Sequence, residues 1–412
     1  MRYQQAFDNS RHRGRVLLHV GAADQIADIY VNQKHLFRHI IPLIVAMVGV
    51  TGCNIWSDYD PNGILSELSI SVSVSDMPGG VSTKALNINP DDYVGAMHDG
   101  EKIQTLRILI VRKDGTIEHN RYMDFYGAIQ RSYLSVHDIR FKVYGPEEKK
   151  VYLFVNENTE KSPIDGISQG KLVDYDFDTL VPGSEFPTET LSELLITLNS
   201  RSEEVIDQEV PSSALPMSEC HTVVMPAKDH HVDLYVTRAA TKFTYIFNNE
   251  SNVDLNLDQL TISKASRKEY YIPQVEYSEG SDPFNNNYTL DSYNVPNIDN
   301  NEYYEFVKSF ASQSIPAATV TALSQSIYLL EGKYTDADGE KDSSGNPLNY
   351  SMSVTLNGTK YSSYFPDVKQ LPRNTHVVVV VSFSNYGTQL EVDWTVDVFP
   401  YGEFWLEPGF GK

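Results

Sequence analysis

Segments of strictly alternating hydrophobicity constrain the fold of this chain more than any other feature of the sequence. In LSISVSVS, residues 68–75, the aliphatic side chains Leu68, Ile70, Val72 and Val74 alternate with serines. A period of two residues is typical of a strand with one buried side. Similar segments recur between turn signals that lie about 8–12 residues apart, and helical periodicity longer than three turns is absent. The sequence therefore predicts an all-β protein built from β-sandwiches.

An apolar run near the start is too short to be a membrane span. Residues 40–50, IIPLIVAMVGV, contain a proline and follow the cationic side chains Lys34 and Arg38. A spanning helix needs about 20 apolar residues, whereas the core of an export signal needs about 7–15. The next residues are Thr51, Gly52 and Cys53.

The segment around Cys53 resembles a lipobox, the site at which a lipoprotein signal is removed. Small residues beside the cleaved bond are required there, and Thr51 and Gly52 supply them. We predict cleavage between Gly52 and Cys53 and an S-diacylglyceryl group on Cys53. Val50 stands where leucine is usual. The alternative is a buried strand that contains a free cysteine.

The first 30 residues have no strand or helix pattern and precede an otherwise ordinary signal. We interpret residues 1–52 as the signal region, with residues 1–30 as an over-extended start. A start codon at Val31 would give a short signal of the usual order.

Composition argues against several classes of partner. The net charge is −22, and residues 1–52 carry +3, so the chain from Cys53 onward carries −25. Such a charge disfavours nucleic acid and anionic lipid surfaces. With Cys53 assigned to lipid, Cys220 is the remaining cysteine, so no disulfide framework is expected.

Two groups of strand segments follow the signal. The first includes 105–123 and 139–155, and the second begins near residue 229. We predict a tether over 53–67, an N-terminal sandwich over 68–225 and a C-terminal sandwich over 226–412. The segment 192–201, SELLITLNSR, is consistent with either a short helix or a strand end.

Several segments, in this order and spacing, resemble the fimbrillin family, the two-domain pilins of Bacteroidia-type (type V) fimbriae. The most similar are VTRAATKFTYIFNN at 236–249, YYIPQ at 270–274 and LPRNTHVVVVVSFS at 371–384. KKVYLFVNEN at 149–158 and WTVDVFPYGEFWLEPGFG at 394–411 resemble further family segments. The resemblance implies two transthyretin-like β-sandwiches in tandem and a fimbrial subunit without catalytic activity, cofactor or metal.

The resemblance also implies a mode of assembly. Pilins of this family lose their first strand to a trypsin-like protease, and a strand of a neighbouring subunit fills the groove. The strand Leu68–Val74 is the candidate for removal, and the bond between Lys84 and Ala85 is the candidate cleavage site. The family's usual cleavage residue is arginine, and no arginine lies between Cys53 and Arg107. The alternative is that this strand is kept as an ordinary part of the sandwich.

The polar residues that stand out in these segments are expected to be structural, and other motifs are weak. Arg238, Lys242, Arg373 and Asn374 are expected to anchor strand ends. The three-residue motif 178–180, DTL, matches a bacterial O-glycosylation site at Thr179.

Three further patterns are too incomplete to indicate a site. The nucleophile-elbow pattern GISQG, 166–170, lacks a preceding strand and a following helix. The residues of 336–342 lack the full spacing of a calcium loop, and those of 220–231 lack paired zinc spacing.

The sequence thus predicts a surface fimbrial subunit made as an outer-membrane lipoprotein. Its expected partners are other fimbrial subunits, the outer membrane through its lipid, and a ligand on a host or bacterial surface. The short tail 403–412 contains Pro408 and is a poor groove filler, which favours a tip or accessory subunit. The alternative is a glycan-binding outer-membrane lipoprotein of a nutrient-uptake system, because many tyrosines lie in polar loops.

Overall fold

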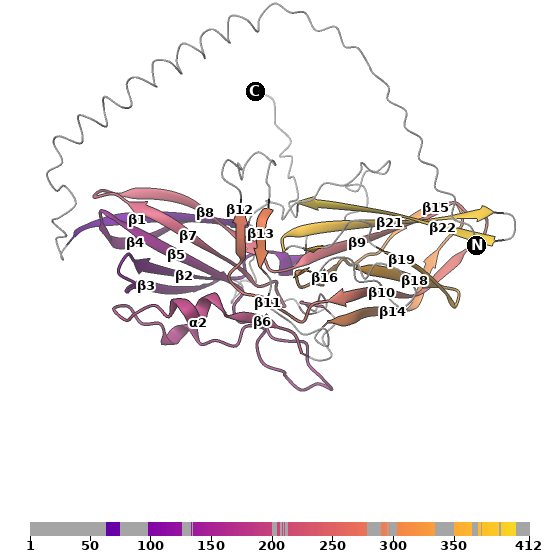
Figure 1. Ribbon diagram of the computed structural model, residues 1–412, viewed down its shortest axis with the longest axis horizontal. Coiled ribbons are helices and arrows are strands. Elements are labelled where there is room, and N and C mark those ends of the chain that lie inside the picture. Colours follow the sequence, from indigo (N-terminus) through magenta and orange to yellow (C-terminus); the bar gives the residue numbers. More distant parts are fainter. Residues whose placement is uncertain are drawn as a thin grey trace, which may run out of the picture. The chain divides into compact units, whose positions relative to one another are not determined.

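The computed structural model is nearly all β, which confirms the fold class that the alternating segments predict. It describes residues 63–74, 98–125, 133, 135–199, 204–206, 208, 210, 213–277, 290–294, 296, 303–333, 350–364, 370, 371, 373–386 and 389–400. Two sheet systems with separate cores account for most of these residues, and Figure 1 labels their strands.

The first sandwich has the hydrogen-bonded strand order β3-β2-β5-β7-β8-β1-β4 in the described part of the chain. Its strands are β1 Ile64–Val74, β2 Thr105–Arg112, β3 Ile117–Asp124, β4 Ser135–Gly145, β5 Glu147–Val155, β7 Met217–Met225 and β8 His230–Arg238. Among described residues, β7 pairs with β8 only at Met217–Arg238 and Ser218–Thr237. The order therefore divides into one layer, β3-β2-β5-β7, and a second layer, β8-β1-β4.

The core of the first sandwich is filled from both layers. Leu68 and Ile70 of β1 and Val236 of β8 are fully buried on one side, and Ile108 of β2 and Leu153 of β5 are fully buried on the other. Along β1 and β4, buried residues alternate with more exposed ones. The period of two in the sequence thus corresponds to the buried sides of the two layers.

The second sandwich has one layer in the order β14-β10-β18-β19 and another in the order β15-β9-β21-β22, with β16 also paired to β9. Its strands are β9 Thr241–Asn249, β10 Leu255–Ala265, β14 Tyr304–Ile315, β15 Thr319–Ala322, β16 Ile327–Leu329, β18 Ser351–Leu356, β19 Thr359–Tyr364, β21 Thr375–Tyr386 and β22 Gln389–Pro400. Strand β21 pairs in parallel with β9 and antiparallel with β22.

The valine run of β21 is buried on both sides. Val377, Val379 and Val381 belong to the main core of the second sandwich, while Val378 and Val380 form a smaller cluster on the opposite face. A strand buried on both faces reads as a continuous apolar run rather than an alternating one. This explains the sequence HVVVVVSF at a central position of the sheet.

Short elements complete the described chain. They are η2 Asp99–Glu101, η3 Phe177–Thr179, α2 Thr188–Ser192, β6 Leu195–Thr197, β11 Lys268–Tyr270, β12 Gln274–Tyr277, β13 Leu290–Asn294, β17 Gly332–Lys333 and β20 Gln370–Leu371. The segment 192–201, for which a helix and a strand were both open, contains the end of α2 and then β6, which pairs with β11.

The first sandwich extends further at both ends than the sequence suggests. Strand β1 begins at Ile64, inside the expected tether 53–67. Strand β8 lies beyond the expected start of the second domain at residue 226, yet it pairs with β1. The change from the first sheet system to the second comes at the fully buried Ala239 and Ala240, which separate β8 from β9.

Candidate functional site

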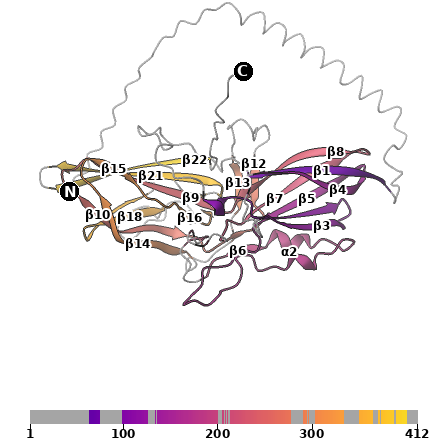
Figure 2. The ribbon, with the colours of Figure 1, turned by 180° about the vertical axis from the view of Figure 1, so that it is seen from behind.

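Strand β1 lies between two walls that come from distant parts of the chain. It pairs antiparallel with β4, where Leu68 faces Phe141, and in parallel with β8, where Leu68 faces His230. Figure 2 shows β1 beside β8 and β4 at one face of the first sandwich. Removal of β1 would therefore unpair both neighbours at once, leaving a groove between β4 and β8.

The inner side of β1 supplies four apolar residues to the core. Leu68, Ile70 and Val72 have no exposed surface, and Val74 is 7% exposed. Each such side chain contributes about 1.5–3 kcal/mol on burial, so the four together give about 6–12 kcal/mol before ordering costs. The four side chains singled out in the sequence thus lie side by side along the core wall of the groove.

The outer side of β1 is held by polar contacts that sequence reasoning missed. The Glu67 carboxylate lies 3.3 Å from Arg140 Nη1 and 3.4 Å from Lys142 Nζ. The Glu67 amide donates to Asp229 Oδ1 at 2.8 Å. Arg140 lies 73 residues and Asp229 lies 162 residues from Glu67 in the sequence, so no local pattern could have indicated these contacts.

The wall formed by β4 is tied to β3 at its other edge by side chains. The Tyr144 amide donates to Glu118 Oε1 at 2.6 Å, and the His119 ring N–H donates to the Lys142 carbonyl over 2.7 Å. Glu118 is itself held by Lys149, whose Nζ lies 2.6 Å from Glu118 Oε2. These bonds occupy backbone groups of β4 that an edge strand would otherwise present to other chains.

The wall formed by β8 is tied to β7. The ring of His221 donates to the Tyr235 carbonyl at 2.7 Å and meets the Tyr235 ring edge-on. Thr237 Oγ1 donates to the Ser218 carbonyl at 3.3 Å. None of these contacts involves β1, so both walls have anchors of their own in the opposite layer.

The residues predicted to be processed lie outside the described part of the chain. These are Gly52, Cys53, Lys84 and Ala85, and the structure gives no geometry for them. Thr179 is described, and it is exposed in η3 with its hydroxyl donating to the Asp176 carbonyl at 2.6 Å.

Two of the cations of the family-like segments, Arg238 and Lys242, are buried on Glu101. Lys242 Nζ lies 3.1 Å from Glu101 Oε1, and Arg238 Nε donates to the Glu101 carbonyl at 3.1 Å. Burial raises the pKa of Glu101, but Lys242, a hydrogen bond from Tyr328 and the charge of Arg238 outweigh it, so the pKa is lowered. The carboxylate is ionised and fully paired, as a structural anchor requires.

Arg373 and Asn374 anchor the start of β21. Arg373 Nη2 lies 2.7 Å from Glu331 Oε1 and 3.1 Å from Glu269 Oε1, all nearly fully buried. Asn374 has a left-handed backbone, with φ of 56°, which asparagine tolerates better than most residues. The acidic partners of Arg373, which are Glu269 and Glu331, were not identified from the sequence.

The weak motifs do not gain support from their surroundings. Gly166 and Gly170 lie in a turn region in which Ile164 and Ile167 pair with each other. Cys220 is a free, partly buried thiol on β7. Within the described ranges, no group of three His, Cys, Asp or Glu side chains is arranged to hold a metal ion. The residues of 336–342 lie outside these ranges.

No helix among the described residues is both long enough and apolar enough to cross a membrane.

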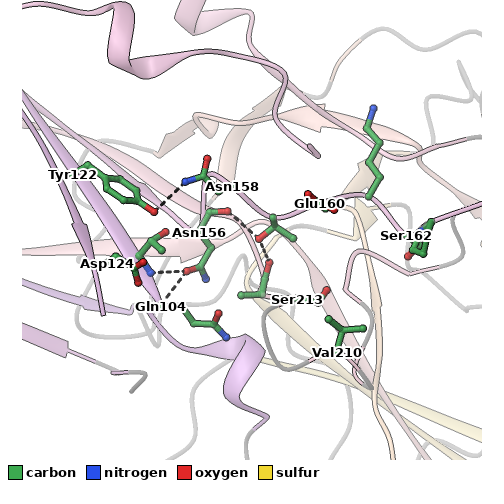
Figure 3. A pocket seen from close by; sticks show the side chains of 14 residues that line it. Gln104, Tyr122, Asp124, Asn156, Asn158, Glu160, Ser162, Val210 and Ser213 are labelled. Atoms are coloured by element: carbon green, nitrogen blue, oxygen red, sulfur yellow. Dashed lines mark hydrogen bonds between the residues drawn. The ribbon is translucent and has the colours of Figure 1, made fainter. Parts of the chain in front are cut away.

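A polar hollow lies at one end of the first sandwich, where β2 begins and β3 and β5 end. Its volume is about 490 Å³. Figure 3 shows Tyr122, Asp124, Asn158 and Glu160 around it, with Asn158 Nδ2 donating to the Tyr122 hydroxyl at 3.0 Å. The Thr105 hydroxyl, on a residue that lines the hollow, is buried and has no hydrogen-bond partner in the protein. The polar groups open to the hollow are therefore those of the exposed side chains Asp124, Asn158 and Glu160.

Asn156, which also lines the hollow, is structural. Its side-chain oxygen accepts from the amides of Gln104 and Thr105, and its amide donates to the carbonyls of Lys102 and Leu215. This side chain uses all its hydrogen-bonding capacity to close the end of β5.

Comparison with known proteins gives a consistent but distant set of similar structures. No protein-family model matches this chain. No curated protein matches it. The tip fimbrial protein Mfa3 from Porphyromonas gingivalis, solved with a C-terminal truncation, is similar at 10% identity and a TM-score of 0.45, covering 81% of this chain and 99% of that one.

Two structures from Parabacteroides distasonis are similar to the same extent. A candidate cell adhesion protein has 15% identity and a TM-score of 0.43, covering 81% of this chain and 97% of its own. A fimbrial assembly protein has 11% identity and a TM-score of 0.39, covering 81% and 99%.

Proposed function

We propose that this protein is a structural and adhesive subunit of a cell-surface fimbria, exported as an outer-membrane lipoprotein and assembled by strand exchange. The observation that carries the proposal is the place of β1. It is the first described strand of the chain, and it fills the centre of the layer β8-β1-β4. Lys84 lies along the chain between the end of β1 at Val74 and the start of β2 at Thr105, so cleavage there would leave every other described strand intact.

The physics of exchange follows from the groove. Without β1, apolar surface under four side chains and the backbone groups of two neighbouring strands would face water, which favours association. A strand from another subunit would restore the backbone hydrogen bonds and fill the same apolar positions. Cleavage after Lys84 would release β1 together with the lipid on Cys53.

The exchange is tested on the complete chain with a specific protease site placed at residues 80–85. A fluorescent peptide of residues 62–76 is expected to enter the cut chain and not the uncut one, as followed by fluorescence anisotropy. If the cut chain takes up no peptide even in mild denaturant, β1 is an ordinary core strand and the proposal is wrong.

Export is tested separately by Cys53→Ala. A cysteine carrying two or three acyl chains is anchored stably, because each buried CH₂ contributes about 0.8 kcal/mol. The variant should accumulate as an uncleaved precursor and be missing from the cell surface. Normal surface delivery of this variant would rule out lipidation at Cys53.

We further propose a tip or accessory role, in which the C-terminus does not donate. Strand β22 pairs with β21 from Gln389 to Pro400, and Val392, Trp394 and Val396 pack against the second core. Deletion of residues 403–412 should then leave incorporation into fibres unchanged. A deleted protein that folds but no longer joins other subunits would identify the tail as a donor.

The polar hollow favours the second candidate, a glycan-binding lipoprotein of a nutrient-uptake system. Tyr122 is 37% exposed beside Asn158 and Glu160, and sugar hydroxyls would find both donors and acceptors there. Titration calorimetry with a panel of neutral hexoses tests it, with Tyr122→Phe as a variant that removes one hydroxyl from the lining of the hollow. Binding that Tyr122→Phe weakens would favour this second function.

A further inference from the structure

On the outer side of β1, Glu67 places one negative charge against the wall formed by β4. Glu67 faces Lys142 in the register of β1 and β4, and its carboxylate lies between Lys142 and Arg140, at 3.4 and 3.3 Å. Glu67 is 28% exposed, whereas the two cations are 60% and 58% exposed. Without β1, two cations would remain beside the groove with no carboxylate from Glu67.

The same residue is also held from the opposite wall. The backbone amide of Glu67 donates to Asp229, the residue that precedes β8, at 2.8 Å. A strand residue at this position thus meets cations through its side chain and an acceptor through its backbone. The position is therefore defined from both walls.

Beyond Glu67, the outer side accepts small hydroxyl residues. Ser69 Oγ lies 3.4 Å from Asp138 Oδ1 and 3.2 Å from His231 Nδ1. Ser71 Oγ lies 3.5 Å from His231 Nε2. Asp138 is fixed by Arg140, with bonds of 2.8 and 2.9 Å, so the acceptor for Ser69 is oriented by one of the cations that contact Glu67.

From this geometry we infer that the groove between β4 and β8 selects its incoming strand by a carboxylate placed opposite Lys142, followed by aliphatic residues at four alternate inner positions. The inference rests on the proposed function, because it assumes that the groove accepts the strand of another polypeptide. The partner is thus a protein whose donor strand begins with an acidic residue and continues with β-branched or leucine side chains.

The charge adds to what apolar alternation specifies of the register. A shift of two residues keeps aliphatic side chains at three of the four inner positions, puts Ser66 or Asp76 at the fourth, and would place Leu65 or Ser69 opposite Lys142. Neither Leu65 nor Ser69 carries a charge. The inner side chains and the carboxylate therefore both favour the correct register, and the carboxylate does so from the outer side.

The C-terminal strand of this chain meets the charge criterion but not the size criterion. Glu391, Val392, Trp394, Val396 and Val398 repeat the spacing of the acid and the four aliphatic residues of β1. In this alignment Trp394 takes the place of Ile70, which has no exposed surface. Insertion of so large a side chain into a packed core is destabilising. The expected occupant is therefore a foreign strand with an aliphatic residue there, and not β22 of a second copy.

The experiment uses the full chain cut at the engineered site within residues 80–85, with its own β1 still in place. Unlabelled peptides compete with a fluorescent peptide of residues 62–76. A peptide carrying Glu67→Gln should compete about 2- to 5-fold less well, and Glu67→Lys about tenfold less well, because exposed ion pairs contribute modestly. Raising the salt concentration should reduce these differences, since the pair is exposed.

A charge swap separates recognition from a general effect of charge. In the cut chain carrying Arg140→Glu and Lys142→Glu, the Glu67→Lys peptide should compete better than the wild-type peptide. The matched control is Lys113→Glu with Lys360→Glu, which makes the same change of net charge at exposed positions outside β1, β4 and β8. This control should keep the wild-type order of the peptides.

The outcomes are distinct. If the wild-type peptide does not enter the cut chain, the proposed function fails. If it enters but all three peptides compete equally, selection by charge is wrong while strand exchange stands. If a peptide of residues 389–399 competes as well as the β1 peptide, the size criterion is wrong and a second copy of this chain can occupy the groove.

Discussion

The first and the last of the described strands, β1 and β22, hold different positions in their sandwiches. Each contains a parallel pair, β1 with β8 in the first and β9 with β21 in the second. In the first, β1 is central in its layer and has neighbours on both sides. In the second, β22 is the last of the described strands in its layer and pairs with β21 along twelve residues.

This difference decides what the loss of each strand would expose. Loss of β1 would leave the groove between β4 and β8, which is bounded by two strands and has a defined register, depth and charge. Loss of β22 would leave an open edge that constrains a newcomer from one side only. A groove bounded on both sides can select the strand that fills it, whereas an open sheet edge can pair with many strands. The first sandwich is therefore the one suited to specific exchange.

The largest expected difference is in the unfolding free energy of matched leucine variants. Leu68→Ala removes a fully buried side chain of β1 and should cost about 2–5 kcal/mol. Leu390→Ala removes a partly buried side chain of β22 and should cost about 1 kcal/mol. Equilibrium urea unfolding measures both. Equal costs would show that β22 is as firmly built into its sandwich as β1.

The two regions should also respond to pH with opposite signs. Burial raises the pKa of Glu219, on β7, to about 7. Burial, with the charge of Lys242, lowers the pKa of His376, on β21, to about 3. In an unfolded chain, glutamate and histidine side chains have pKa values of about 4.3 and 6.5. The contribution of Glu219 is therefore present below about pH 4.3 and lost as pH rises to about 7, while that of His376 is present above about pH 6.5 and lost as pH falls toward about 3.

Two single variants separate these effects. Glu219→Gln should abolish the loss of stability between about pH 4.3 and 7, and His376→Gln should flatten the loss below about pH 6.5. The measurement is the unfolding free energy as a function of pH for each variant and the wild type. If Glu219→Gln alters the limb below pH 4.3 instead, the assignment of that carboxyl is wrong.

The smallest expected effect concerns the anchor of the β4 wall. His119→Ala removes the bond to the Lys142 carbonyl and should cost about 0.5–1.5 kcal/mol. Hydrogen exchange should rise along the outer edge of β4. Asn385→Ala, which removes a 2.8 Å bond to Asn252 in the second sandwich, is the matched control and should leave β4 unchanged. Faster exchange in both variants would mean that β4 is not anchored locally.

The sequence was sufficient for the all-β fold class and for the inner side of β1, because both depend on a local period of two. It was insufficient for the boundary between the sandwiches. The segment 230–249 alternates almost continuously, and its division at Ala239 and Ala240 depends on β8 pairing with β1, which lies more than 150 residues earlier. Pairing between strands so far apart in the sequence produces no local sequence pattern.

The same limit applies to the polar contacts. Arg238 and Lys242 were expected to be structural, but Glu101 lies 141 residues before Lys242 in the sequence. Arg140 and Lys142 alternate in the sequence with the apolar residues Ile139, Phe141 and Val143. Only the register with β1 shows that they face Glu67.

The most direct test of the central claim is a disulfide that locks β1 in its own groove. Ser69 and Arg140 face each other in the register of β1 and β4, so Ser69→Cys with Arg140→Cys places two thiols across the pair. The matched lock is Ser382→Cys with Asp393→Cys, between β21 and β22. In fimbriated cells, the oxidised β1 lock should keep the protein out of sheared fibres, reduction should restore its incorporation, and the β22 lock should have no effect. Equal incorporation of the oxidised β1 lock and the wild type would contradict strand exchange at this groove.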